Sequence, residues 1–412
     1  MNDEIFIGVD VSEATLEVAF LRDDGTHVRP NQSFPNIPKG HRDMKGAVIA
    51  AARLVGRKTN IIVGMESTAN FHKNLELVLR NNKPKHIEVH VINPKCTKNF
   101  RKMNLKVFKT DKLDAHMIAL YLAKIQPKPN VPDIEGQEEL KELTRLRRSY
   151  IEESTKFKNR LRKLLRRYFP GYKQYLGNQI SRKMLVAFSK FGEPDMILKK
   201  NVNFIANTKT AVRHKIGTDF AEALIQLAKQ APSRKLNKGV VVAIKLTAQR
   251  ILDIMTQIKQ FEDLIEQTLN DYFPDHKLNS VPGLGNTSIA SIIAEVGDVN
   301  RFDSVDKFIG YTGLYPVVWE SGEMKVRFRM TNKGNKMLKM TFLIASAPGR
   351  NFNPVLRFFY DRLRAKGKSK KAAGGAIARK LAVIVFTLLY KNEEWNPEIA
   401  AKYLERSLKK TG

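Results

Sequence analysis

The chain is poor in the features that stabilise a secreted or membrane-bound protein. Cys96 is the only cysteine among 412 residues, which excludes an internal disulfide or a cysteine zinc cluster and suits a reducing cytoplasm. No apolar run approaches the roughly 20 residues that cross a bilayer, so we expect no membrane partner. The opening residues, Met1 to Glu4, have neither the basic nor the apolar region of a signal peptide. We therefore expect a cytoplasmic protein.

Acidic residues are scarce relative to basic ones. The chain has 41 Asp and Glu against 72 Lys and Arg, which gives a net charge of +31. An excess of this size predicts polyanionic partners, bound with an affinity that falls as salt rises because counterions are released. With 42% hydrophobic residues the chain can still bury substantial cores, and its length allows two or three domains.

The first 130 residues alternate between strand-like and helix-like patterns. Alternating apolar residues predict a strand pair, short apolar runs predict further strands, and segments of helical periodicity lie between them. The predicted strands span 4–21, 60–65 and 87–92, and the predicted helices span 38–56, about 70–82 and a segment that starts near Asp111. This order predicts an α/β domain with a mixed sheet over residues 1–130.

The remaining residues are predicted to be mainly α-helical. Residues 137–168 combine an apolar stripe with basic faces that include Arg147, Arg160 and Arg166, which are candidates for contacts with nucleic-acid phosphates. Residues 240–273 repeat isoleucine every seven positions, so the two long helices could pair as a coiled coil, within the chain or between protomers. We predict coiled-coil arms over 135–275 with an inserted helical and loop segment at 170–240, a C-terminal domain over 277–390 and a tail over 391–412.

Four acidic residues stand in informative positions. Asp10 and Glu66 each end a strand-like run, and Asp111 and Asp114 lie one helical turn apart, on one helix face. Carboxylate oxygens are ligands that Mg²⁺ prefers, and paired ions can stabilise the attacking and leaving oxygens of a phosphodiester. The set favours a metal site that acts on nucleic-acid phosphate. Plainer interpretations exist: Asp10 as a strand-end turn residue, as in actin-like sugar kinases, and Asp111 as a helix N-cap.

Two C-terminal segments are further candidates. Residues 281–285, Val-Pro-Gly-Leu-Gly, resemble the hairpin of helix-hairpin-helix modules, in which Gly283 and Gly285 would let backbone N–H groups approach a phosphate. A plain glycine turn explains these residues equally well. Ser321 is a candidate nucleophile, although a serine hydroxyl needs a base, a metal or cations to act. From spacing alone it is more simply a turn serine. The cations that could hold a scissile phosphate beside it are Lys325, Arg327, Arg329 and Lys333.

Taken in order, these motifs resemble the insertion sequence 110 family of transposases, which are bridge-RNA-guided recombinases. The resemblance covers residues 1–130 and about 277–370. It rests on the Asp-Glu-Asp-Asp order, on Asp-x-x-Asp-Ala at 111–115, and on Val-Pro-Gly-Leu-Gly, Gly-Leu-x-Pro, Ser-Gly and Lys-x-Gly-Asn in the C-terminal part. Two departures are the extra length at 170–240 and Met330-Thr331-Asn332, where many relatives have a Ser-Lys type approach.

The resemblance implies a fold and a chemistry. It implies a RuvC-like domain of RNase H fold whose residues Asp10, Glu66, Asp111 and Asp114 bind Mg²⁺. It implies a helical C-terminal transposase domain in which Ser321 forms a transient phosphoserine link to DNA. It also implies double-stranded donor and target DNA, a noncoding guide RNA encoded by the element, and prokaryotic homodimers that assemble into homotetramers.

Two other hypotheses stay open from the sequence. In a metal-dependent nuclease of the Holliday-junction resolvase type, the four acids do all the chemistry and Ser321 is structural. In a non-catalytic nucleic-acid-binding protein, alanine at Asp10 or Glu66 changes only stability. Cleavage that survives the loss of Ser321 identifies the first, and the absence of divalent-metal binding identifies the second.

Overall fold

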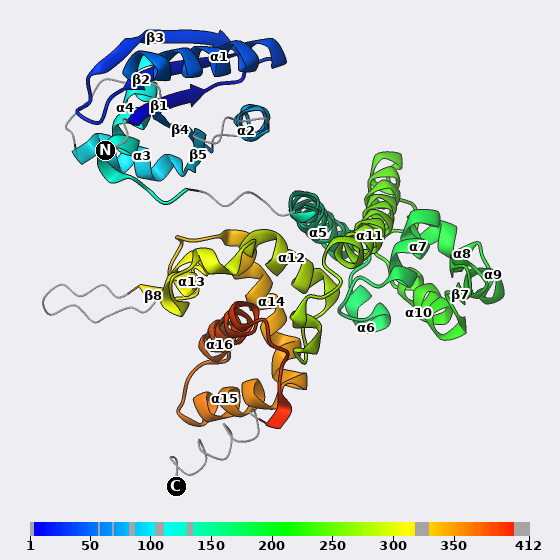
Figure 1. Ribbon diagram of the computed structural model, residues 1–412. Coiled ribbons are helices and arrows are strands. Elements are labelled where there is room, and N and C mark those ends of the chain that lie inside the picture. Colours follow the sequence, from blue (N-terminus) through cyan, green and yellow to red (C-terminus); the bar gives the residue numbers. More distant parts are fainter. Residues whose placement is uncertain are drawn as a thin grey trace, which may run out of the picture. The chain divides into compact units, whose positions relative to one another are not determined.

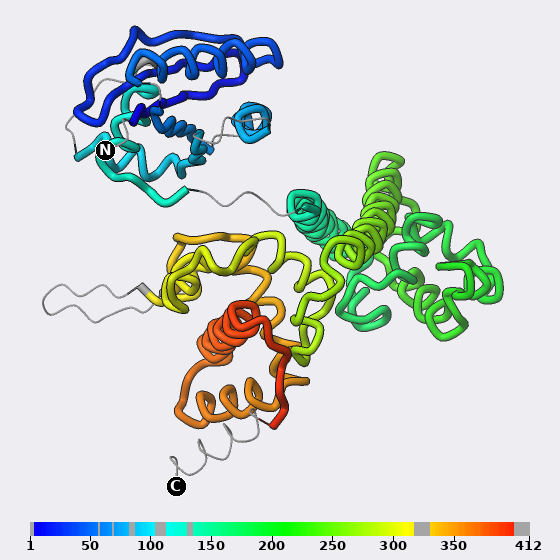
Figure 2. The backbone as a smooth tube through the Cα atoms, in the orientation of Figure 1, coloured from blue at the N-terminus to red at the C-terminus, as the bar shows by residue number. Residues whose placement is uncertain are grey.

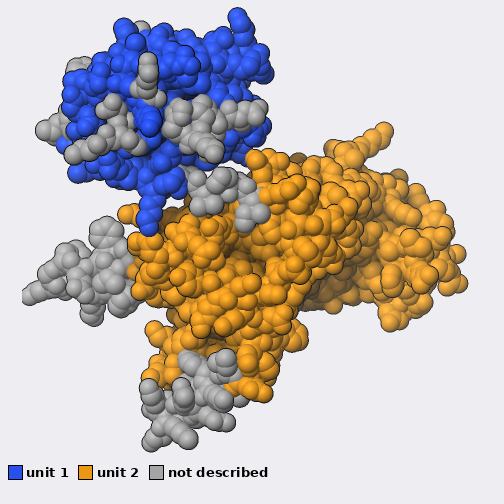
Figure 3. Space-filling view, viewed as in Figure 1, with its two compact units in different colours: residues 1–132 blue, residues 133–412 orange. Residues whose placement is uncertain are grey.

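The chain folds into two compact units, residues 1–132 and 133–412 (Figure 3). The computed structural model describes residues 4–56, 58–67, 70–81, 87–103, 111–129, 135–317 and 329–398. Each unit has a hydrophobic core of its own. The finer division into arms, insertion, C-terminal domain and tail stays a prediction.

The first unit is built on a mixed sheet, as the sequence predicts, and the sheet has five strands. Its strand order is β3-β2-β1-β4-β5, with β1, β4 and β5 mutually parallel and β2 and β3 antiparallel to their neighbours (Figure 1). The strands are β1 Glu4–Val11, β2 Thr15–Leu21, β3 His27–Pro35, β4 Asn60–Glu66 and β5 Ile87–Ile92. The helices are α1 Pro38–Val55, α2 Lys73–Arg80, α3 Pro94–Met103 and α4 Asp111–Ile125.

Helices cover both faces of this sheet. Ile7 and Val9 of β1 are fully buried in a cluster that also holds Met44 of α1 and Leu75 of α2. Phe6 is buried on the opposite face in a cluster that includes residues of α4. Since successive strand residues point to opposite faces, the even-numbered residues of β1 face α4. This face becomes the candidate site.

The second unit is organised around two long helices, α5 Gln137–Tyr168 and α11 Lys238–Tyr272 (Figures 1 and 2). They run antiparallel and pack together, with the rings of Tyr150 and Phe261 5.0 Å apart. Thr268 donates to Glu139 at 3.1 Å near one end of the pair. The pairing therefore lies within the chain, while supercoiled coiled-coil geometry stays a prediction.

Residues between the long helices form a small helical lobe. Phe188 of α7 is fully buried with Leu161 and Leu165 of α5 and with Ile244 and Ile251 of α11. The heptad isoleucines in the first half of α11 therefore pack against this lobe. Its elements are α6 Tyr172–Leu176, α7 Arg182–Lys190, α8 Pro194–Leu198, α9 Val202–Ala206, β6 Lys209–Ala211, β7 His214–Lys215 and α10 Thr218–Lys229.

The C-terminal part packs five α-helices around a second core. Phe308, Phe342 and Leu381 are fully buried there, together with Ile265 from the far end of α11. The helices are α12 Asn286–Val296, α13 Val305–Thr312, α14 Lys336–Phe352, α15 Pro354–Ala365 and α16 Lys370–Lys391. A two-residue strand pair, β8 Pro316–Val317 and β9 Arg329–Met330, and the 3₁₀ turns Lys277–Ser280 and Val299–Arg301 complete this part.

One described helix passes a length and composition test for a membrane span, although the sequence has no uninterrupted apolar run of that length. Among the described residues α16 is long and apolar enough, by length and composition, to cross a membrane. Arg379 and Lys380 divide the apolar residues of this helix into two shorter runs. Its Leu381 and Val385 are fully buried against the other C-terminal helices. The apolar composition of α16 is therefore explained by its place in the core of the second unit.

Candidate functional site

Two of the predicted carboxylates end neighbouring parallel strands. In the β1–β4 ladder Gly8 is opposite Gly64 and Val9 is opposite Met65. Asp10 and Glu66 each follow by one residue, so they lie side by side at the carboxyl ends of the two strands. Both are half-buried. The apolar runs before them therefore place the two acids at one edge of the sheet.

Helix α4 crosses the sheet directly beside these residues. A Cβ added at Gly8 would come within 2.0 Å of the carbonyl oxygen of Ala115, so only glycine permits this approach of strand and helix. Asp10 is two residues after Gly8 and therefore points to the same side, and Asp114 immediately precedes Ala115. The structure thus gathers Asp10, Glu66 and Asp114 on one face of the sheet. Asp111 is the first residue of α4, and its side chain lies outside the described residues.

Helix α3 supplies partners to two of these carboxylates. The hydroxyl of Thr97 donates to Glu66 Oε1, and the guanidinium of Arg101 donates to Asp114 Oδ1. Asp114 is only 8% exposed, so the Arg101 contact offsets much of the cost of burying its charge. Sequence patterning predicts no helix here and identifies neither partner.

A further carboxylate, Glu17, belongs to the same face. It is opposite Asp10 in the β1–β2 ladder, and its Oε2 is buried without a hydrogen-bond partner. The donor set is thus entirely carboxylate oxygen, which suits a hard divalent cation. Within the described parts of the chain, no group of three or more His, Cys, Asp or Glu side chains is close enough to hold a metal ion. Asp10, Glu66 and Asp114 therefore suit Mg²⁺ by donor chemistry and lie on one face of the sheet, and a metal site formed by the four acids stays a prediction.

The strand pair β8–β9 brackets the segment that carries the candidate serine. Ser321, Lys325 and Arg327 lie outside the described residues, and so does the side chain of Arg329 in β9. On either side of this segment, Gly313 and Gly334 meet closely: a Cβ on Gly334 would lie 2.7 Å from the backbone nitrogen of Gly313. The Gly-Leu-x-Pro and Lys-x-Gly-Asn motifs are therefore packed against each other. Lys333 is exposed beside this contact.

Asn335, the last residue of the Lys-x-Gly-Asn motif, belongs to a buried polar network that the sequence did not reveal. Its Nδ2 donates to Glu295 Oε2 at 2.6 Å, and its Oδ1 accepts from the backbone N–H of Leu338 at 3.0 Å, which caps α14. Arg145 of α5 donates to both oxygens of Glu295, at 2.8 and 3.0 Å. The Glu295 side chain is 1% exposed, so this charge depends on its partners.

The glycines of the Val-Pro-Gly-Leu-Gly segment differ in role. Gly283 has a φ of +89°, and a Cβ there would lie 2.7 Å from the Cα of Gly349 in α14. Gly285 is the N-cap of α12, and nothing lies within 4 Å of the Cβ position. Close packing therefore explains Gly283, and only Gly285 leaves room for a phosphate to approach the backbone.

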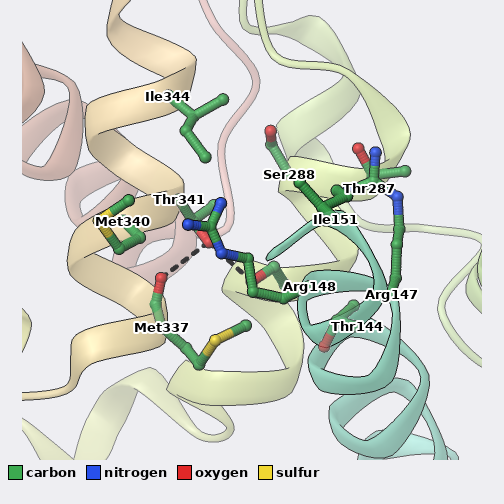
Figure 4. A pocket seen from close by; sticks show the side chains of 11 residues that line it. Thr144, Arg147, Arg148, Ile151, Thr287, Ser288, Met337, Met340, Thr341 and Ile344 are labelled. Carbon is green, nitrogen blue, oxygen red and sulfur yellow. Dashed lines mark hydrogen bonds between the residues drawn. The ribbon is translucent and has the colours of Figure 1, made fainter. Parts of the chain in front are cut away.

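The predicted cations of α5 also differ. Arg147 pairs with Glu262 of α11 at 2.7 Å and so helps to join the long helices. Arg160 and Arg166 are exposed. A cavity of about 290 Å³ lies between α5, α12 and α14, where Arg148 projects toward α14 and Thr341 bonds to Ser291 at 2.8 Å (Figure 4). Arg160 and Arg166 thus remain the better candidates for phosphate contacts.

Comparison with known proteins explains why these motifs occur in one chain. Residues 7–170 match a transposase model of the IS110 type named for its DEDD residues, and residues 275–361 match the transposase IS116/IS110/IS902 family. This chain belongs to the IS110 family of transposases. The family resemblance of the sequence is thereby confirmed. The first match contains all four predicted acidic residues, and the second contains the C-terminal motifs.

Curated relatives of this IS110-family chain come from several bacteria. It is 25% identical over 242 residues to an uncharacterized protein of insertion element IS110 from Streptomyces coelicolor, covering 58% of this chain and 59% of that protein. It is 24% identical over 385 residues to a mini-circle putative transposase for IS117 from the same organism, covering 90% of each. A pilin gene-inverting protein of Moraxella lacunata is 28% identical over 150 residues, 36% of this chain and 47% of the relative. The first of these matches spans less than two thirds of the relative's length.

Proposed function

We propose that this IS110-family chain is a DNA recombinase that excises and inserts a mobile element by phosphoryl transfer. One observation carries the proposal: Asp10, Glu66 and Asp114 gather on one face of the sheet, within a segment that matches a transposase family model. The net charge of +31 suits a polyanionic substrate. Relatives named as a transposase and as a pilin gene-inverting protein support the same class of reaction on DNA.

Asp10, Glu66, Asp111 and Asp114 would hold the divalent cation, for which we propose Mg²⁺. When bound, the cation would stabilise negative charge on the oxygens of the scissile phosphate. Arg101 and Thr97 of α3 donate hydrogen bonds to Asp114 and Glu66, and the guanidinium charge of Arg101 offsets the negative charge of Asp114 while no cation is present.

Ser321 is the proposed nucleophile. Its Oγ would attack phosphorus and lose its proton, while the bond from phosphorus to one deoxyribose oxygen breaks and that oxygen takes up a proton. Attack by a DNA hydroxyl on the phosphoserine would reverse the step and release the enzyme. Lys325, Arg327, Arg329 and Lys333 are the proposed cations around the phosphate. The contact between Gly313 and Gly334 supports this proposal, because it fixes both ends of the segment that contains the serine.

We further propose, from the family resemblance, that an element-encoded noncoding RNA pairs with donor and target DNA, and that homodimers assemble into tetramers. Purification with the flanking element DNA present, a high-salt wash and sequencing of the retained RNA test the first part. One discrete structured RNA with loops that match element ends and insertion site supports guidance. Random fragments or no RNA contradict it.

The serine chemistry is tested with a denaturant-resistant protein–DNA adduct. The parent chain and the control Ser288→Ala should form the adduct in the presence of Mg²⁺, and Ser321→Ala should not. The resolvase alternative predicts cleavage by Ser321→Ala without any adduct in the parent. Asp10→Asn should abolish cleavage under both hypotheses, whereas a non-catalytic binding protein would show neither cleavage nor divalent-metal binding.

A further inference from the structure

A second cavity, of about 780 Å³, lies in the C-terminal part between the β8–β9 pair and the first half of α16. The sequence singles out Ala-Ala-Gly-Gly-Ala at 372–376, a motif that the proposed chemistry does not use. Gly375 and its small neighbours on α16 line the cavity, and a Cβ on Gly375 would lie 3.0 Å from Cε of Met330. The small residues of this motif therefore keep the cavity open.

The cavity has an apolar floor and a cationic rim. Tyr315 and Met330 contribute the floor, and Lys368, Lys371 and Arg379 contribute the rim. None of the described side chains that line it is acidic. Arg379 lies 3.9 Å from Asp306, whose side chain is 91% exposed, so solvent screens that pair strongly. The apolar surface could contact a nucleotide base, and the three cations beside it could contact the attached phosphate. The cavity volume lies in the range of roughly 300–1,000 Å³ that is typical of small-molecule sites.

The position of the cavity favours DNA as the source of that nucleotide. Pro316 lines it and is five residues before Ser321. Five residues span at most roughly 18 Å, whatever path they take, so Pro316 is tethered within roughly 18 Å of the proposed nucleophile. The strand that the serine attacks is therefore the nearest nucleic acid.

We propose that this cavity binds one unpaired nucleotide of the DNA strand near the cleavage point, with its base on the Tyr315–Met330 floor and its phosphate among the three cations. The inference rests on the proposed recombinase function and adds a binding site to it. A base inside a duplex is stacked and paired, so it must leave the helix to enter a concave site. The cavity should therefore favour single-stranded or locally opened DNA over an intact duplex.

The test uses the full chain and a short single-stranded DNA that carries one 2-aminopurine, a base whose fluorescence reports its surroundings. Gly375→Leu fills the cavity and should weaken binding about tenfold, a typical loss for one base–protein stacking contact, and abolish the fluorescence change. Gly374→Leu is the matched control, because Gly374 is adjacent on α16 and nothing lies within 4 Å of its Cβ position. It should bind as the parent does.

A second pair of variants guards against misfolding of Gly375→Leu. The exposed rim lysines are replaced in Lys368→Gln/Lys371→Gln, and the control Lys366→Gln/Lys370→Gln removes the same charge at exposed neighbours that do not line the cavity. The rim pair should lower the salt slope of single-strand binding by about 0.7 for each phosphate that these lysines neutralise, beyond the change in its control.

The outcomes separate this inference from the proposed function. If the parent cuts and joins DNA while both cavity variants match their controls, the cavity proposal is overturned and the recombinase proposal stands. If the variants weaken binding of an RNA strand but not of a DNA strand, the assignment to DNA is wrong. If the parent binds neither duplex DNA nor the single strand that carries 2-aminopurine, both the cavity proposal and the recombinase proposal are wrong.

Discussion

Replacing Asn335 should show that the last residue of the Lys-x-Gly-Asn motif acts by holding the fold around the proposed active serine. Asn335→Ala removes the cap of α14, a loss of about 1 kcal/mol. It also removes the 2.6 Å donor to the buried carboxylate of Glu295, and hydrogen bonds to charged groups contribute about 1.5–3 kcal/mol. We expect a total loss of roughly 3 kcal/mol in the free energy of unfolding of the second unit.

Two further substitutions at this position divide the loss into its parts. Asn335→Ser keeps a good capping oxygen but cannot reach Glu295, so it should lose only about 2 kcal/mol. Asn335→Asp keeps the cap and sets a second carboxylate against Glu295, so it should be the most damaging at neutral pH. Its deficit should shrink as the pH falls, because repulsion from Glu295 raises the pKa of the new carboxyl group and protonation removes the repulsion.

Tryptophan fluorescence during urea unfolding measures these losses. Both tryptophans belong to the second unit, and Trp395 packs against its core. A loss of 3 kcal/mol corresponds to a decrease of roughly 6–12 °C in melting temperature for a unit of this size. If all three variants unfold within about 0.5 kcal/mol of the parent yet lose recombination, the structural role is wrong and Asn335 acts in the chemistry.

Three further predictions concern other parts of the molecule. Gly8→Ala should destabilise the first unit by about 3 kcal/mol, because its Cβ collides with the α4 backbone, whereas Gly46→Ala, which meets nothing within 4 Å, should be neutral or slightly stabilising in circular-dichroism melts. Burial lowers the pKa of His41 below its ordinary 6.5, so the first unit should lose stability as the pH falls below that value, and His41→Gln should flatten this dependence. Arg160→Gln and Arg166→Gln should each lower the salt slope of duplex DNA binding by about 0.9, without a change in melting temperature, if each arginine contacts a phosphate.

Local patterns were enough to predict the sheet but not its edge. The apolar residues of β1, β2 and β4 gave the positions of these strands, because helices cover both faces of the sheet and most residues of the three strands are buried. β3 spans His27–Pro35 and carries two prolines in polar surroundings. Prolines are tolerated there because β3 is an edge strand, a fact that only the strand order reveals.

The sequence could predict only those residues of the candidate site whose local pattern is distinctive. Asp10 and Glu66 follow apolar strands, and that position is visible in the sequence. Glu17 joins them only through the antiparallel register with Asp10, and Arg101 reaches Asp114 across the chain from α3. Glu295 lies 40 residues before Asn335, so no local pattern connects the two. Contacts of this kind depend on tertiary packing, which strand and helix periods do not encode.

In a basic chain, a cation of the protein can compete with a metal ion for the carboxylates of the proposed site, and Arg101 makes this competition measurable. Its guanidinium bonds to Asp114, with side chains 18% and 11% exposed, so water screens the pair only weakly. A cation that binds Asp114 competes with this guanidinium for the same carboxylate. Arg101→Met should therefore raise the affinity for Mn²⁺, measured by calorimetry, by roughly tenfold, which corresponds to ~1.4 kcal/mol, about the lower end for a charged hydrogen bond.

The control for this prediction is Lys102→Met, which removes the same charge from the exposed side of the same helix. Its effect should be small, because an exposed charge acts on the site only through screened, long-range attraction. If both variants raise the affinity equally, the net charge of α3 matters and the specific contact does not. If Arg101→Met lowers the affinity, Arg101 orients Asp114 for the cation, and the competition argument is wrong.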